Sequence, residues 1–125
     1  MRGYAAERVF SEIALKDFQR ATALVDCLPD VDSEGRLIRC HEVVRALKDR
    51  LHPDWELEDG HYKTVNHTWL VSRRGHILDL YSVARFPVVQ LFDSDIHFHR
   101  NIYKAGKPRT DIRQDVVQFL RTRLS

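Results

Sequence analysis

The sequence lacks any hydrophobic run long enough to cross a membrane. No stretch within its 125 residues reaches the roughly 18 consecutive apolar residues that mark a transmembrane helix. The first residues, 1–8, carry neither the apolar segment nor the small-residue cleavage site of a secretory signal peptide. We therefore expect a cytoplasmic protein that does not enter a membrane.

Cysteine is scarce, since the sequence contains only Cys27 and Cys40. In a reducing compartment the two are not expected to form a disulfide, and two thiols make no zinc site without histidine ligands. A glycine-rich phosphate loop and a dinucleotide-binding fingerprint are also missing, so no cofactor is expected. Each thiol is then either a small core residue or a nucleophile.

The composition is ordinary for a globular domain, with 43% hydrophobic and 30% charged residues. A chain of this length supports one hydrophobic core, and no repeat, low-complexity tract or linker divides it. We expect a single domain over residues 1–125. Its core spans 35–103, with flanking helices at about 5–28 and 111–124.

Apolar residues at three- and four-residue spacing predict these two helices and a third between them. The middle helix carries Cys40 on its apolar side and begins either near Ile38 or Arg39, or at Ser33. In the last helix, Asp111 is expected to cap the first turn, with Gln114 three residues on.

The region between the middle and last helices is rich in β-branched and aromatic residues. Four runs predict strands: His61–Val71, Gly75–Ser82, Val88–Phe92 and Ile96–Tyr103. The order helix, helix, strands, helix indicates an α+β fold in which helices pack on an antiparallel sheet.

One predicted hairpin brings two polar residues together. The loop 73–75 has glycine where a three-residue turn needs a left-handed residue, and it pairs Ser72 with His76. In that register His67 and Asp79 point to the same face as diagonal neighbours. A carboxylate within the apolar run around Asp79 is costly to bury without a partner, and His67 is the nearest one.

Cys40 is the third candidate. If its helix begins near Arg39, the sulfur lies in the first turn, where the helix dipole favours the thiolate. Arg36 and Arg39 are expected to add positive charge there.

These residues fall in short motifs that resemble the transglutaminase-like core of the papain-like thiol enzymes. That group includes arylamine N-acetyltransferases and bacterial peptidases, amidases and deamidases. The resemblance covers about residues 35–82 and lies in Cys40-His41-Glu42-Val43, Gly60-His61-Tyr62, His67-Thr68-Trp69-Leu70 and Gly75-His76-Ile77-Leu78-Asp79.

The resemblance implies a catalytic triad. Cys40 would attack a carbonyl to form a thioester, His67 would exchange the proton, and Asp79 would orient the imidazole. The backbone N–H of Cys40 would stabilise the oxyanion. Glu42 matches the Cys-x-Glu of some relatives, although a plain helix position is the simpler interpretation. The implied substrate is a peptide, a protein or a small amide; a relative that kept the scaffold without the activity is the alternative.

Two other functions compete with a thiol enzyme. His97 and His99 alternate on a predicted strand and would form a zinc site with His67, Asp79 or Cys40.

The second alternative is a nucleic-acid or protein binding module. Residues 97–125 hold 7 Lys/Arg against 2 Asp/Glu, whereas residues 1–96 hold 13 against 16. Such a basic end fits phosphate contacts; the candidate residues are Arg100, Lys104, Lys107, Arg109 and Arg113, with Tyr103 for stacking.

Overall fold

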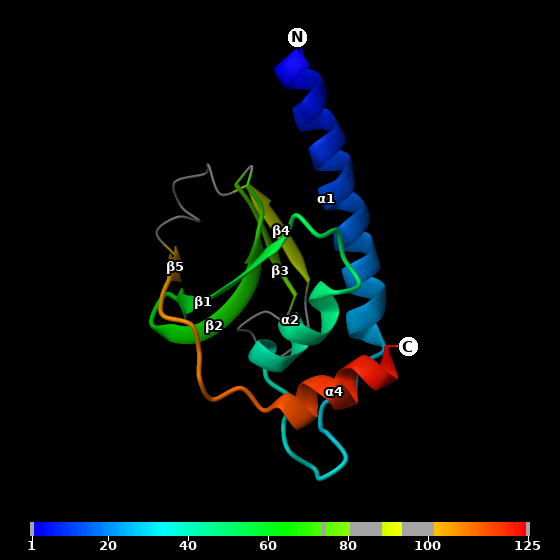
Figure 1. Ribbon diagram of the computed structural model, residues 1–125, viewed down its shortest axis with the longest axis vertical. Coiled ribbons are helices and arrows are strands. Elements are labelled where there is room, and N and C mark those ends of the chain that lie inside the picture. The colour runs from blue at the N-terminus through cyan, green and yellow to red at the C-terminus, as the bar shows by residue number, and fades with distance from the viewer. Residues whose placement is uncertain (1, 74, 81–88, 94–101, 125) are drawn as a thin grey trace.

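The structure is a computed structural model and describes residues 2–73, 75–80, 89–93 and 102–124. It has an α+β fold in which helices pack on an antiparallel sheet, as expected (Figure 1). The elements are α1 Arg2–Asp26, α2 Cys40–Lys48, β1 Glu56–Tyr62, β2 Val65–Val71, β3 His76–Asp79, β4 Gln90–Asp93, β5 Tyr103–Ala105 and α4 Gln114–Arg123. None of these helices is both long and apolar enough to span a membrane.

The sheet has the strand order β4-β3-β2-β1-β5, and every pairing in it is antiparallel. Because side chains alternate along a strand, Leu70 and Leu78 point to one face. There they pack with the apolar sides of the helices, including Val43, Val44 and Leu47 of α2. Trp69 and Ile77 point to the opposite face and belong to a separate cluster.

The sheet is strongly curved around that second cluster. Phe92 on β4 and Tyr103 on β5 belong to opposite edges, which in a flat five-stranded sheet would lie about 19 Å apart. Their ring centroids are 5.9 Å apart. The curvature, visible along β2 in Figure 1, brings Tyr103 into contact with both Phe92 of the opposite edge and His67.

The predicted hairpin register is confirmed. Leu70 pairs with Leu78 and Val71 with Ile77, and Gly75 has the expected left-handed φ of 84°. The backbone N–H of Ser72 donates to the carbonyl of His76 at 2.9 Å.

The predicted strand His61–Val71 is wrong, because the chain reverses within it at Lys63, whose φ is 55°. Strands β1 and β2 form a hairpin across this turn, and β1 begins earlier, at Glu56. The sequence of β1, ELEDGHY, is poor in β-branched residues, so propensity did not reveal it. Of the predicted strand Ile96–Tyr103, residues 96–101 lie outside the described part of the chain.

Helix α2 begins at Cys40 with Arg39 as its N-cap, the first of the two expected starts. The predicted cap of the last helix is wrong, since α4 begins at Gln114 with Arg113 as N-cap. Asp111 lies outside the helix because its carboxylate pairs with Arg109 and Arg39.

Candidate functional site

Cys40 is the first residue of α2, and its thiol is half-buried. Arg39 provides no side-chain hydrogen bond to cap this helix. The backbone N–H of Glu42 donates to the carbonyl of Arg39, and the helix dipole favours a negative charge at this end of α2. Cys27 is exposed just beyond α1.

His67 and Asp79 are in direct contact. Nε2 of His67 lies 2.8 Å from Oδ2 of Asp79, and each side chain is 1% exposed. The Tyr103 hydroxyl donates to the same oxygen at 2.7 Å. Because Nε2 is engaged with the carboxylate, Nδ1 is the ring nitrogen of His67 left to exchange a proton with another group.

The Cys40 thiol and the His67 imidazole interact electrostatically. Burial raises the pKa of the thiol, but hydrogen bonding and charge from His41 and His67 outweigh this effect and lower it to about 6. Burial lowers the pKa of His67, but Asp79 and Cys40 outweigh that and raise it to about 9. At neutral pH the favoured state is therefore a thiolate beside an imidazolium.

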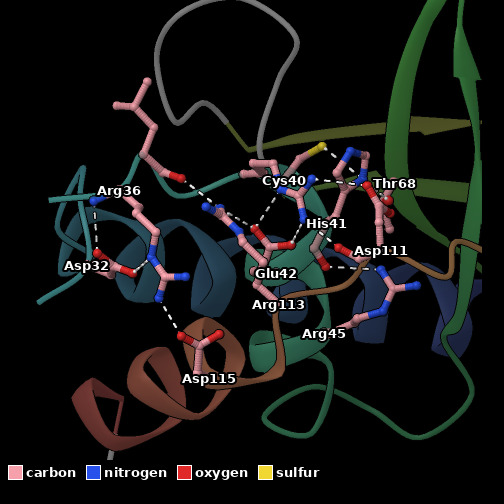
Figure 2. Close-up of polar contacts among 12 residues, drawn as sticks. Asp32, Arg36, Cys40, His41, Glu42, Arg45, Thr68, Asp111, Arg113 and Asp115 are labelled. Atoms are coloured by element: carbon pink, nitrogen blue, oxygen red, sulfur yellow. Dashed lines mark hydrogen bonds and ion pairs between the residues drawn. The ribbon is translucent and has the colours of Figure 1, made fainter. Parts of the chain in front are cut away.

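The expectation that Arg36 and Arg39 supply positive charge to the thiol is wrong. Arg36 pairs with Asp32 and Asp115, as Figure 2 shows, and Arg39 pairs with Glu42 and Asp111. Carboxylates compensate the charges of both arginines. The side chains that lower the pKa of the thiol are the imidazoles of His41 and His67.

Glu42 is not a plain helix residue. Its side chain is 0% exposed and accepts hydrogen bonds from Arg39 at 2.6 Å and, as Figure 2 shows, from Arg113 at 2.7 Å. These ion pairs hold the segment before α4 against the first turn of α2. Glu42 thus fixes the position of the turn that carries Cys40.

Aromatic rings surround the imidazole of His67. Trp69 stacks with it at a centroid distance of 6.1 Å and an interplanar angle of 24°, and Tyr62 meets it edge-on at 6.1 Å. Trp69 in turn lies over Gly60, where an added Cβ would come within 2.8 Å of the indole. The rings exclude water from the His67–Asp79 pair.

Two groups of this site were missed from the sequence. Tyr103 was a candidate for nucleic-acid stacking, and its contact with Asp79 depends on the sheet's curvature, which has no local sequence signal. Asp59 was not singled out as a site residue, but it is 4% exposed. Its signal was the alternation of β1: Leu57, two residues earlier, packs on the core.

The zinc alternative has no geometric support in the described residues. Within them, no group of three or more His, Cys, Asp or Glu side chains is arranged to hold a metal ion. His97 and His99 lie outside the described part of the chain.

The binding-module alternative is weakened by contacts of its own residues. Arg109 pairs with Asp111, and Arg113 with Glu42. Tyr103 is 7% exposed, which leaves no open ring face for stacking. Lys104 and Lys107 are exposed, and Arg100 lies outside the described residues.

Family models, curated proteins and solved structures were all compared with this chain, and none matches it.

Proposed function

We propose that the protein is a thiol enzyme that cleaves or transfers an acyl group at an amide or peptide bond, with Cys40 as nucleophile, His67 as acid–base and Asp79 as orienting carboxylate. The observation that carries this proposal is the buried His67–Asp79 contact on an imidazole that interacts with Cys40. The placement of the thiol at a helix start, with the other two residues on adjacent strands, also supports the resemblance to the transglutaminase-like core.

The first half-reaction forms a thioester. The Cys40 thiolate attacks the substrate carbonyl carbon, and the carbonyl oxygen becomes an oxyanion that the backbone N–H of Cys40 stabilises. The imidazolium of His67 then protonates the leaving nitrogen from Nδ1. The C–N bond breaks and the amine departs, while Asp79 holds Nε2–H.

The second half-reaction regenerates the enzyme. Neutral His67 takes a proton from the acceptor as its oxygen or nitrogen attacks the thioester carbon. The C–S bond breaks, and sulfur leaves as the thiolate beside the protonated imidazole. Water as acceptor gives a peptidase, amidase or deamidase, and an amine gives a transferase.

An activated ester tests this chemistry without knowledge of the natural substrate. We expect p-nitrophenyl acetate to give a burst of p-nitrophenolate, with the acetyl group found on Cys40 by peptide mass spectrometry. Cys27→Ser should retain the burst, and Cys40→Ala should lose it.

His67→Ala distinguishes catalysis from simple thiol reactivity, since it leaves the sulfur in place and removes its proton acceptor. We expect a loss on the order of 10²–10⁴-fold in acylation rate. Equal acetylation of Cys27 and Cys40 in the wild type, or an undiminished burst in His67→Ala, would refute the proposal.

A further inference from the structure

A second chain of polar side chains reaches the Cys40 sulfur, and the triad does not use it. Nδ1 of His41 lies 3.7 Å from Sγ of Cys40 and 2.6 Å from Oγ1 of Thr68. The Thr68 hydroxyl lies 2.7 Å from Oδ1 of Asp59. Figure 2 shows His41 and Thr68 together beside the sulfur.

The positions of the protons in this chain follow from its chemistry. Burial raises the pKa of Asp59, but Arg45, the backbone N–H of Arg109 and Thr68 outweigh it and lower the pKa, so the carboxylate is ionised and only accepts. The single hydroxyl proton of Thr68 therefore points to Asp59. Oγ1 of Thr68 can then only accept from His41, so Nδ1 of His41 carries a hydrogen.

We propose that His41 is a positioning residue whose Nδ1–H, fixed by Thr68 and Asp59, is shared with the Cys40 sulfur and stabilises the thiolate. With its Nδ1 lone pair occupied by hydrogen, His41 takes no proton from the sulfur through that nitrogen. The two imidazoles beside Cys40 thus have separate tasks: His67 exchanges the proton, and His41 donates a hydrogen bond.

The chain is anchored at its far end, which makes the donor rigid. Arg45 pairs with Asp59 at 2.6 Å and also donates to the backbone carbonyl of His41 at 3.0 Å. The backbone N–H of Arg109 donates to Asp59 at 3.1 Å. Thr68 is 0% exposed and His41 5%, so water does not compete for these hydrogen bonds.

The ionisation of Cys40 thus responds to groups from several packed elements. The titratable and charged groups that bear on it are His41 and Arg45 of α2, Asp59 of β1, His67 of β2 and Asp79 of β3. Disruption of the His41–Thr68–Asp59 chain is expected to change the thiol pKa while the His67–Asp79 contact stays intact.

The role given to His41 rests on the proposed function, because a stabilised thiolate matters only if Cys40 is a nucleophile. The test, however, measures only the ionisation of the Cys40 thiol and needs no substrate. In a Cys27→Ser background, the alkylation rate of Cys40 by iodoacetamide is followed between about pH 4.5 and 9.5. Thr68→Val removes the acceptor that orients His41, and we expect the midpoint to rise by about one pH unit, a tenfold change in the thiolate ratio. Thr68→Ser keeps the hydroxyl and should leave the midpoint near that of the wild type.

His41 itself gives a second pair of variants. His41→Leu should raise the midpoint as Thr68→Val does, while His41→Gln keeps an N–H donor and should move it less. An unchanged midpoint in folded Thr68→Val and His41→Leu would overturn the assignment. So would a His41→Leu protein that loses acylation as completely as His67→Ala, because His41 would then be the proton acceptor.

A measurement on the wild-type protein covers the case in which the variants do not fold. Nitrogen-15 NMR of the histidine rings reports which nitrogen carries hydrogen, and we expect Nδ1–H at His41. An unprotonated Nδ1 would overturn the assignment. A protein that forms no acyl-enzyme but shows this proton and these midpoint shifts would refute the proposed function and leave the role of His41 standing.

Discussion

The imidazole of His67 and the carboxylate of Asp79 form a hydrogen bond of 2.8 Å although both side chains are 1% exposed. Burying a charged pair is unfavourable unless further hydrogen bonds satisfy it, and Tyr103 supplies one at the same carboxylate oxygen. The pair therefore lies in the interior of the curved sheet. Nδ1, the nitrogen of His67 that does not contact Asp79, is left to interact with Cys40.

Asp79→Asn is expected to lower both the acylation rate and the pKa of His67. The amide has no charge to stabilise the imidazolium, and its neutral oxygen accepts from His67 and Tyr103 more weakly than the carboxylate oxygen does. We expect acylation to fall by a factor on the order of 10³–10⁴. NMR titration of His67 should give a midpoint well below the value of about 9 in the wild type.

Asp17→Asn is the matched control for this substitution. Asp17 is also a buried aspartate, 6% exposed, and it accepts from the indole N–H of Trp55 at 2.7 Å. Its replacement should lower the free energy of unfolding without changing the titration of His67. A His67 midpoint that is unaltered in Asp79→Asn would show that the carboxylate does not hold the imidazolium.

The reactivity of Cys40 should depend on pH in two steps. With a thiol pKa of about 6, the alkylation rate should rise to a plateau well below pH 8.5, where an ordinary thiol is only half ionised. A second change is expected near pH 9, where His67 loses its proton and the thiolate loses its cationic neighbour. Iodoacetamide labelling of the Cys27→Ser protein against N-acetylcysteine measures both steps.

His67→Ala should shift the rise in reactivity to higher pH, because burial raises the pKa of the thiol and His41 alone is left to lower it. If the wild-type profile instead coincides with that of N-acetylcysteine, Cys40 is not activated.

The local features of this site could be predicted from the sequence. The turn at Gly75 fixed the β2–β3 register and with it the common face of His67 and Asp79, because both depend on a few consecutive residues. The apolar spacing also predicted α2, although it left the start of the helix open between the residues next to Cys40 and Ser33.

The long-range features could not be predicted. Arg36 was expected to act on the thiol, but it pairs with Asp115, which is 79 residues away in sequence. Tyr103 reaches Asp79 only because the sheet curls, and curvature is a property of all five strands together. Composition and hydrophobic periodicity indicate neither the Arg36–Asp115 ion pair nor the curvature of the sheet.

Gly60→Ala is expected to destabilise the protein and disturb the ring that covers His67. An added Cβ would come within 2.1 Å of the carbonyl oxygen of Lys104 and within 2.8 Å of Trp69. Since the first contact is with the backbone of the paired strand, β1 and β5 must separate to relieve it. We expect a loss of about 1–3 kcal/mol in the free energy of unfolding, measured by urea denaturation.

Gly35→Ala separates this steric effect from backbone strain. Gly35 has a φ of 79°, but a Cβ there would meet nothing within 4 Å. The Gly35→Ala protein should be less stable because alanine is strained at this positive φ, and it should keep the near-ultraviolet circular dichroism signal of Trp69. If Gly60→Ala also leaves that signal and the His67 titration unchanged, the close packing of Trp69 on Gly60 does not position the imidazole.

Glu42→Gln is expected to destabilise the protein at neutral pH and to make it less sensitive to acid. Burial raises the pKa of Glu42, but Arg39 and Arg113 outweigh it and lower the pKa below its usual range. The carboxylate therefore stabilises the fold fully above about pH 5, and this contribution is lost as the pH falls toward the folded pKa. We expect Glu42→Gln to cost about 2–4 kcal/mol at pH 7, and the difference from wild type to shrink progressively below about pH 4.

Glu12→Gln provides the comparison, because Glu12 is an exposed helix glutamate. Its replacement should change the free energy of unfolding by less than about 0.5 kcal/mol both at pH 7 and below about pH 4. The two arginines that contact Glu42 are themselves partly exposed, at 32% and 24%, so water offsets part of their loss and the cost should stay in the lower half of the range. A difference between Glu42→Gln and wild type that stays constant from pH 7 to about pH 3 would mean that the stabilisation by Glu42 comes from packing and not from its charge.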